Sequence, residues 1–254
     1  MKESTIQKYI DKNFSDSDSY EKEHLRTDWQ KKEKDAVSIV LDFEKRVELV
    51  SKKRILDIGF GNGIILGAFS KKGAIMTGIE VDETLRTIAK EYLDENNILG
   101  DLYIHDGLIL PFEDNSFDYV FSTSVLEHVD NPDIFLKEAN RVLKSGGKMY
   151  LAFPNRFAFR DSHSGVYFLG YLPHFFADKL LSFLGKGSLK NWNLHFLSYF
   201  TLLRIIKRNK INFRVVMETE AKTPFRKIIK KTLAFFGIHF GAILSHIIII
   251  LEKK

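Results

Sequence analysis

The sequence predicts an α/β fold in which a doubly wound, mostly parallel sheet carries helices on its faces. Two observations support this prediction. Short apolar runs alternate with amphipathic stretches between residues 54 and 153, and strands that are separated by helices pair in parallel through right-handed crossovers. The chain has 254 residues, of which 44% are hydrophobic, so it can bury one large core with an added cap.

The elements follow one another in a regular order. From Asp28 to Val50 apolar residues recur every three or four positions, which indicates an amphipathic helix. Glycine, proline and capping residues separate the later elements, with Asp82 as a candidate N-cap. We expect strands over 54–59, 74–79, 102–105, 117–122 and 148–153, and helices over 64–71, 83–96 and from Asn131-Pro132 to Gly146-Gly147. Functional residues should follow the carboxyl ends of the strands.

Composition excludes several classes of site. The chain has no cysteine, so it has no disulfides, no thiolate metal site and no cysteine nucleophile. We expect no metal site. Residues 1–150 carry a net charge of −7, whereas residues 151–254 hold 17 Lys/Arg and 5 Asp/Glu, a net charge of +12. The basic half could meet phosphate, a membrane surface or nucleic acid, or could simply be a solvated face.

The two ends of the chain bear on its location. Residues Met1 to Ser19 are polar and lack the features of a secretory signal, so we expect a cytoplasmic protein. Residues 232–251 carry no charge, but Ile247–Leu251 is a β-branched run that favours a buried strand over a spanning helix. Residues 225–242 could form a basic amphipathic helix on an anionic leaflet, which predicts peripheral contact at the inner face of the membrane.

The most informative motif is a glycine loop where the first strand turns into a helix. It reads Asp57-Ile-Gly59-Phe60-Gly61-Asn-Gly63, and glycine there allows positive φ and close approach of the backbone to a ligand. The third glycine of a dinucleotide loop is replaced by Ile64 or Leu66, and the Lys-Ser/Thr pair of a phosphate loop is missing.

This loop and the segments after it resemble the methyltransferase type 11 subfamily of class I S-adenosylmethionine-dependent methyltransferases. The resemblance covers residues 50–155 and rests on the glycine loop, Glu80, His105-Asp106-Gly107, Leu110-Pro111-Phe112, the segment 115–129 and Arg141 to Gly147. It implies a seven-stranded sheet whose last strand is antiparallel, with S-adenosyl-L-methionine as the cofactor. The implied cofactor-binding residues are Asp57, Gly59, Phe60, Gly61, Gly63, Glu80, Val81, Asp106, Gly107 and Ser122.

The resemblance also assigns roles. It implies that Glu80 accepts hydrogen bonds from both ribose hydroxyls, since a carboxylate has two acceptor oxygens. It implies that Asp106 binds the adenine amino group. Methyl transfer to a hydroxyl also needs a base. Our first candidate is His163, oriented by Asp161, although a surface histidine would look the same; His128, after the fourth strand, is the second.

The segment after the fifth strand is predicted to bind the acceptor. Arg156, Arg160 and Tyr167 are the candidate substrate-binding residues, because guanidinium groups suit phosphates and carboxylates. We expect a helical extension over 1–50 and a methyltransferase domain over 51–254 with an aromatic cap at 155–200.

We predict methyl transfer to a hydroxyl of a sugar, glycan or lipid-linked acceptor. The alternatives are a quinone- or phenol-type small molecule, or a non-catalytic module that only binds the cofactor. Nucleic acid is not expected as a substrate, because Ser122 to His128 replaces the Asn/Asp-Pro-Pro-aromatic tetrapeptide of amino-directed base methylation. The atom that is methylated and the oligomeric state stay open.

Overall fold

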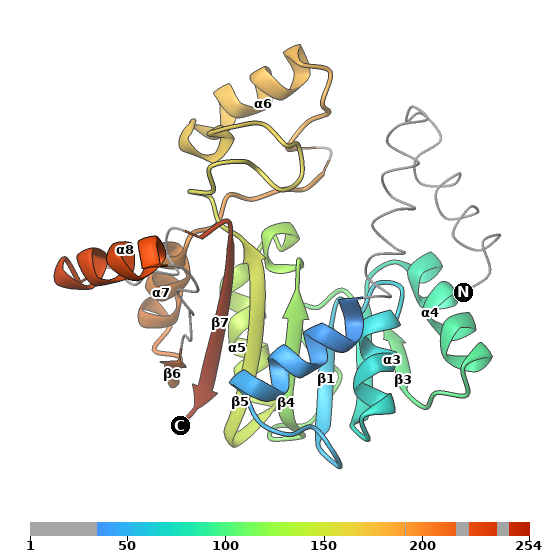
Figure 1. Cartoon of the computed structure of the whole chain (residues 1–254). Helices are drawn as coiled ribbons and strands as arrows, with labels where there is room; N and C mark the ends of the chain where they lie inside the picture. Colours follow the sequence, from blue (N-terminus) through green and yellow to red (C-terminus); the bar gives the residue numbers. More distant parts are fainter. Residues whose placement is uncertain (1–34, 191, 217–223, 238–243) are drawn as a thin grey trace. The chain divides into compact units, whose positions relative to one another are not determined.

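The computed structural model describes residues 35–190, 192–216, 224–237 and 244–254 (Figure 1). The extension predicted over residues 1–50 therefore lies largely outside the described residues. Of the helix expected from Asp28 to Val50, residues 35–46 are helical. Its buried face includes Val40 and Phe43, at the three-residue spacing that indicated a helix.

A seven-stranded sheet organises the chain, in the order β3-β2-β1-β4-β5-β7-β6. Strand β1 pairs in parallel with both β2 and β4, β2 pairs in parallel with β3, and β7 pairs antiparallel with β5 and β6. The predicted fold, including the antiparallel last strand, is confirmed. The strands are β1 (Arg54–Ile58), β2 (Ile75–Glu80), β3 (Asp101–Ile104), β4 (Phe117–Thr123), β5 (Leu143–Pro154), β6 (Phe213–Val216) and β7 (His246–Lys253).

The chain divides into two compact units, the first of which comprises residues up to Phe121 together with Val142–Gly147. Its core is aromatic: the Phe69 ring packs at 5.1 Å from Phe43 and 5.0 Å from Phe121, measured between ring centroids. Helices α3 (Ile64–Lys71) and α4 (Glu83–Glu95) follow β1 and β2. The Asp82 carboxylate accepts the backbone N–H of Thr84 at 2.6 Å, so the predicted N-cap is confirmed.

The second unit comprises residues 122–141 and 148–254. It contains the short helix η1 (Leu126–His128) and most of α5 (Pro132–Val142). The prediction that α5 runs to Gly146-Gly147 is wrong, because the helix ends at Val142 and β5 begins at Leu143. A Cβ on Gly147 would lie 2.9 Å from the backbone oxygen of Asp118, so this glycine allows close approach to β4 rather than stopping a helix.

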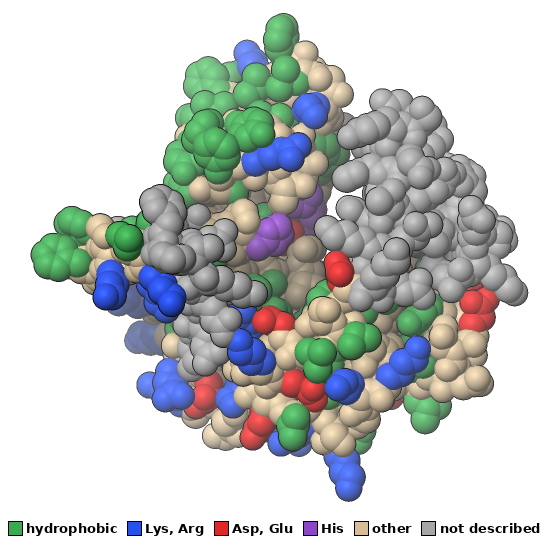
Figure 2. Space-filling view, in the orientation of Figure 1, with side chains coloured by type: hydrophobic (Ala, Val, Ile, Leu, Met, Phe, Trp, Pro, Cys, Tyr) green, Lys and Arg blue, Asp and Glu red, His purple; other side chains and the backbone are tan. Residues whose placement is uncertain are grey.

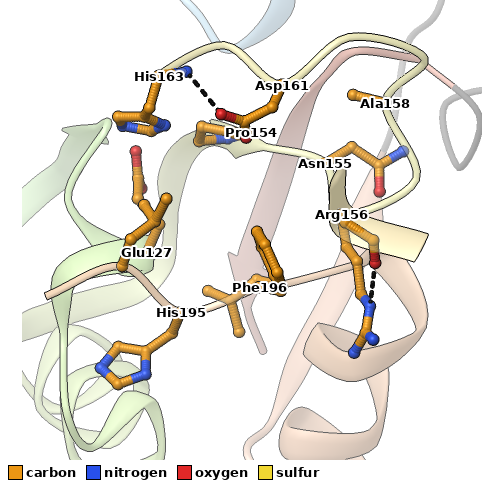
Figure 3. A pocket seen from close by; sticks show the side chains of 12 residues that line it. Glu127, Pro154, Asn155, Arg156, Ala158, Asp161, His163, His195 and Phe196 are labelled. Atoms are coloured by element: carbon orange, nitrogen blue, oxygen red, sulfur yellow. Dashed lines mark hydrogen bonds between the residues drawn. The ribbon is translucent and has the colours of Figure 1, made fainter. Parts of the chain in front are cut away.

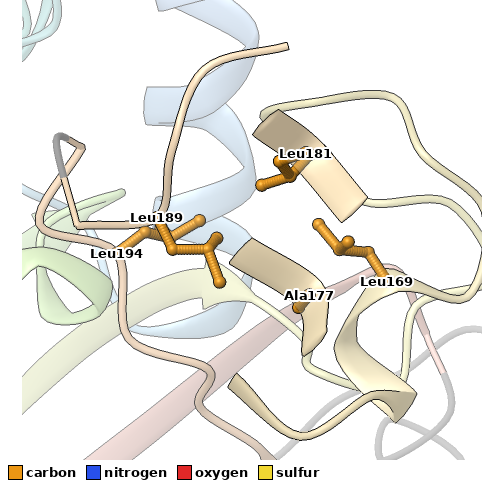
Figure 4. Packing of buried hydrophobic residues seen from close by; sticks show 5 residues of the cluster. All are labelled: Leu169, Ala177, Leu181, Leu189 and Leu194. Atoms are coloured by element: carbon orange, nitrogen blue, oxygen red, sulfur yellow. The ribbon is translucent and has the colours of Figure 1, made fainter. Parts of the chain in front are cut away.

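A cap within the second unit contains η2 (Leu169–Tyr171) and α6 (His174–Phe183). Figure 4 shows its own small hydrophobic core, formed by Leu169, Ala177, Leu181, Leu189 and Leu194. The Asp178 carboxylate accepts from the Ser188 hydroxyl at 2.9 Å and from the backbone N–H of Leu189 at 2.7 Å. These bonds close the loop after α6, so the cap has its own packing and hydrogen bonds.

The remaining elements of the second unit are α7 (Tyr199–Arg208), α8 (Pro224–Phe235), β6 and β7. In β7, Ile247, Ile249 and Leu251 are fully buried, and Ile249 pairs with Leu151 of β5. The apolar run is therefore a strand, as predicted. Helix α8 ends at Phe235. Of the helix predicted over residues 225–242, residues 238–242 lie outside the described residues. Within the described ranges no helix is long and apolar enough to cross a membrane.

Candidate active site

The glycine loop follows β1 in the first unit. Gly59, Gly61 and Gly63 have φ values of 78°, 57° and 74°, a region that side chains other than glycine rarely adopt. A Cβ on Gly63 would lie 2.7 Å from the Ala89 Cβ, whereas one on Gly61 would meet no atom within 4 Å. Gly63 therefore allows α3 and α4 to pack closely, and Gly61 lies beside open space.

Glu80 closes β2 and holds this loop. Its Oε2 accepts the backbone N–H of Gly61 at 3.0 Å, and its Oε1 accepts the N–H of Val81 at 2.8 Å. Oε1 also accepts the N–H of Asp82 at 3.4 Å, whereas Oε2 keeps a further lone pair for a ligand hydroxyl. Burial, and secondarily the nearby Glu80 carboxylate, raises the pKa of Asp57 from 3.8 to about 8, so Asp57 is protonated at neutral pH.

The segment after β3 lies next along the same edge, because β3 pairs in parallel with β2. Asp106 Oδ1 accepts the backbone N–H of Leu108 at 3.0 Å, and its side chain is largely exposed. A Cβ on Gly107 would meet no atom within 4 Å. This edge fits a ligand with vicinal hydroxyls and an amino group, such as the adenosine of S-adenosylmethionine. Glu80 offers a two-oxygen acceptor and Asp106 an accessible carboxylate, with open space at Gly61 and Gly107.

Three other predicted cofactor residues differ in accessibility. Val81 is exposed, whereas Phe60 is buried and faces Gly78, where a Cβ would lie 2.5 Å from the Phe60 ring. Ser122 is fully buried in β4, so solvent does not reach its hydroxyl. Phe60 therefore packs the loop against Gly78 of β2. The cofactor-binding role of Ser122 stays a prediction.

The second unit contains a pocket of its own, shown in Figure 3. It brings together His163, Asp161 and Arg156, three of the predicted residues, with residues that the prediction did not include. Its lining is completed by Glu127, Pro154, Asn155, Ala158, Gly170, Leu194, His195, Phe196 and Leu197. The predicted residues Arg160 and Tyr167 are not part of this lining.

Glu127 is the most unusual residue of the pocket. It is 1% exposed, and neither of its carboxylate oxygens has a hydrogen-bond partner in the described part of the chain. Burial raises the pKa of Glu127 from 4.5 to about 7, because a charged carboxylate loses its hydration there. In Figure 3 the carboxylate points toward the His163 ring.

His128 and His163 complete a cluster with Glu127, and one ligand atom from each lies within 4.8 Å of the others. His128 Nδ1 lies 3.0 Å from the Trp192 carbonyl oxygen, and since a carbonyl oxygen only accepts, Nδ1 carries a proton. The His163 ring packs edge-on against His128, with centroids 5.6 Å apart. Loss of water around the ring lowers the pKa of His163. The Asp161 carboxylate acts in the opposite direction, and the nearby His128 lowers the pKa slightly further.

Asp161 does not orient the imidazole of His163 as predicted. Its Oδ2 accepts the backbone N–H of His163 at 3.2 Å and both the N–H and hydroxyl of Ser164 at 2.7 Å. Asp and Asn side chains commonly bond to the backbone two or three residues ahead, and that local bond prevails here. Asp161 fixes the loop that carries His163, rather than the ring.

The predicted substrate-binding arginines also bond to the cap backbone. Arg156 Nε donates to the Gly170 carbonyl at 2.7 Å, and Arg160 Nε donates to the Gly165 carbonyl at 2.9 Å. The Arg160 guanidinium lies over the Tyr167 ring, 5.8 Å from its centroid. Both arginines therefore shape the loop, and any substrate role uses their remaining N–H groups.

The candidate residues predicted from the sequence did not include Glu127. The available signal was its position: a Glu-His pair directly after the carboxyl end of β4, where ligands bind in such sheets. Its burial without a partner could not be read from the sequence, because the covering residues come from beyond Pro154.

The family model described as a methyltransferase domain matches residues 56–151. The ubiquinone biosynthesis O-methyltransferase of Coxiella burnetii is 33% identical over 104 residues, which span 41% of this chain and 44% of that protein. The chain thus matches less than half the length of such curated relatives.

Solved structures support the fold over more of the chain. An S-adenosylmethionine-dependent methyltransferase from Mesorhizobium loti superposes with a TM-score of 0.59 at 16% identity, covering 84% of this chain and 96% of that one. The YcgJ protein from Bacillus subtilis gives a TM-score of 0.58 at 17% identity, covering 86% and 98%. At such identity the likeness shows the fold alone.

Proposed function

We propose a function from one premise: this chain carries a class I S-adenosylmethionine-dependent methyltransferase domain of the type 11 family. We propose that the protein transfers the methyl group of S-adenosylmethionine to a hydroxyl oxygen of an acceptor. The observation that carries the proposal is the Gly59–Gly63 loop held by Glu80 at the carboxyl ends of parallel strands. The O-methyltransferase named among the relatives supports oxygen as the methylated atom.

The first unit is proposed to bind the cofactor. Glu80 accepts the two ribose hydroxyls, Asp106 accepts the adenine amino group, and the glycine loop leaves room for the chain that bears the sulfur. When bound, the cofactor supplies a methyl group whose carbon–sulfur bond breaks as a carbon–oxygen bond forms, leaving S-adenosylhomocysteine, while the acceptor loses its proton.

The second unit is proposed to manage that proton. In the metal-free chain, His163 takes the proton of the acceptor hydroxyl. Its lowered pKa leaves the ring neutral at pH 7, so the ring can accept that proton. Glu127, within 4.8 Å, stabilises the imidazolium that forms. Asp161 keeps the His163 loop in place through its bonds to the backbone, and His128 supports the ring at its edge.

We propose that the acceptor hydroxyl is attached to a lipid. The cap exposes Phe175, Phe176 and Phe183 on α6, with exposed fractions of 61%, 58% and 86%. Figure 2 shows hydrophobic side chains gathered over α6. Exposed aromatic patches mark contacts with apolar partners. A glycan-lipid and a prenylated phenol both meet this description, and the second fits the relatives that are named for ubiquinone biosynthesis.

We propose peripheral contact with an anionic membrane through α8. Lys227, Lys230 and Lys231 are exposed on this helix, together with Ile228 and Phe235. Basic residues beside exposed apolar ones suit the interface of an anionic leaflet. Such contact would bring the protein to an acceptor that resides in the membrane.

The test uses the purified chain, S-adenosylmethionine with an isotope-labelled methyl group, and three acceptors: a prenylated catechol, a polyprenyl-linked glycan and the corresponding free sugar. We expect labelled product, identified by mass, with a lipid-borne acceptor, and loss of that product in Glu80→Ala. Label in the free sugar alone would contradict a lipid-borne acceptor. Cofactor binding without labelled product from any of the three would favour the non-catalytic module.

A further inference from the structure

We infer that Glu127, His128 and His163 form a binding site for one divalent transition-metal ion, such as Zn²⁺, Mn²⁺ or Co²⁺. Two imidazoles and one carboxylate are a common ligand set for these ions. Their ligand atoms lie within 4.8 Å of one another. Two atoms that each lie about 2.1 Å from one ion can be up to about 4.2 Å apart, so small side-chain rotations complete the site.

The buried Glu127 carboxylate gives an independent reason for a ligand here. Its two oxygens have no partner among the residues that the structure describes, and the residue is almost wholly buried. A buried polar group without a hydrogen bond is costly and calls for an explanation. An ion between the carboxylate and the two imidazoles supplies the missing partner.

The hydrogen bonds of His128 also suit a metal ligand. Its Nδ1 is directed at the backbone carbonyl oxygens of Trp192 and Asn193, at 3.0 and 3.2 Å. Histidines that bind metals usually donate their second ring N–H to such a group, which fixes the tautomer and orients the ring. The Asn193 side chain donates to the His128 carbonyl at 2.8 Å, so the same loop holds both backbone and ring.

The site is open on one side. His163 lies on an exposed loop, whereas Glu127 is buried beneath it, so an ion can enter from solvent and keep coordination positions for other ligands. Metal binding itself does not depend on the proposed function; only the role of the ion in the reaction rests on it. In that role a bound ion lowers the pKa of a coordinated acceptor hydroxyl. His163 is then a ligand, and the base role given to it above belongs to the metal-free chain.

The test measures metal binding alone, on the full chain after chelator treatment and without a histidine tag. Calorimetry with Zn²⁺ and Mn²⁺, and the visible spectrum of added Co²⁺, report affinity and coordination without any acceptor. We expect one ion per chain, and affinity at least tenfold weaker in Glu127→Gln, His128→Ala and His163→Ala. His195→Ala is the matched control, because His195 lines the same pocket outside the cluster.

The inference is overturned if the wild-type chain binds none of these ions, or if His195→Ala weakens binding as much as the three cluster variants do. Thermal unfolding of each metal-free variant checks that it is folded. His163→Asn serves as a second variant, since this exposed position tolerates a polar side chain. Failure here leaves the proposed function intact when the metal-free chain still binds S-adenosylmethionine and yields labelled product.

Discussion

The Glu80 carboxylate accepts the backbone N–H of Gly61 at 3.0 Å, and this bond joins the end of β2 to the loop after β1. The same carboxylate binds the N–H of Val81. Glu80 thus organises the loop before any ligand arrives. Preorganised acceptors lower the cost of ordering the site when a ligand binds.

The glycine loop allows a prediction about packing. Gly63→Ala places a Cβ 2.7 Å from the Ala89 Cβ, and neither atom is the end of a flexible side chain. Overpacking of this kind costs about 1–3 kcal/mol, in addition to about 1–2 kcal/mol for positive φ. Gly61→Ala is the matched control, because it also has positive φ but meets no atom within 4 Å. Equal losses in urea unfolding would contradict the packing role of Gly63.

Asp57 predicts a pH dependence of stability. Its pKa is about 8 in the folded chain, against 3.8 when unfolded, so the folded state holds a proton that the unfolded state releases. This contribution to the free energy of unfolding is fully present below pH 4 and is lost as the pH rises to 8. Asp57→Asn should flatten the decline between pH 4 and 8 in chemical denaturation. Glu127 also has a raised pKa and lowers stability with rising pH in the same way, but it is present in both proteins and so does not affect their difference. An identical slope of unfolding free energy against pH in the wild type and in Asp57→Asn would refute the assignment.

The basic helix α8 predicts salt-dependent membrane binding. Each lysine near an anionic leaflet contributes about 1 kcal/mol, so reversing Lys227, Lys230 and Lys231 to Glu should weaken binding to phosphatidylserine vesicles roughly a hundredfold or more at low salt. The measurement is vesicle cosedimentation.

A matched triple variant controls for net charge in that experiment. Lys52, Lys71 and Lys90 are exposed residues of the first unit, and reversing them makes the same change in charge. We expect this variant to retain more vesicle binding than the α8 variant. Equal losses would show that total charge, rather than α8, drives the contact, and wild-type protein that ignores the vesicles would remove the membrane proposal.

The pocket predicts an effect of Glu127 on proton transfer. Glu127→Gln keeps the side-chain volume but removes the charge that stabilises protonated His163. Methyl transfer by the metal-free chain should fall about tenfold or more, which is less than the roughly 10²–10⁴-fold effect of a general base because His163 is still present. Calorimetric affinity for S-adenosylmethionine should stay unchanged. Unchanged turnover would show that Glu127 has no role in the reaction.

The sequence predicted the glycine-loop side of the molecule better than the pocket. Gly59 to Gly63 and Asp106 each follow a strand within a few residues, and Glu80 is the last residue of one. Local patterns and strand pairing were therefore enough to place them along one edge. Glu127 and His163 are 36 positions apart in the sequence, and their meeting depends on the path of the cap. The bond of Asp161 to the backbone rather than to the His163 ring was likewise invisible, because both arrangements have the same spacing.

The helix and strand boundaries also differ in whether local sequence or a distant contact determines them. Asp82 was correctly predicted as an N-cap, since its effect is local. Gly146 and Gly147 were misread as a helix stop. A Cβ on Gly147 would lie 2.8 Å from the backbone oxygen of Lys144 and 2.9 Å from that of Asp118, which is on another strand. Local sequence carries no signal for such a contact.

Calorimetric titration of S-adenosylmethionine into the purified wild-type chain, Glu80→Ala and Gly61→Val tests the central claim most directly. A hydrogen bond to a charged group contributes about 1.5–3 kcal/mol, so loss of the Glu80 carboxylate should weaken binding about tenfold or more. Gly61→Val should weaken it as well, because a β-branched residue is strained at a φ of 57°. Absence of binding in the wild-type chain, or equal affinity in all three proteins, would contradict the account.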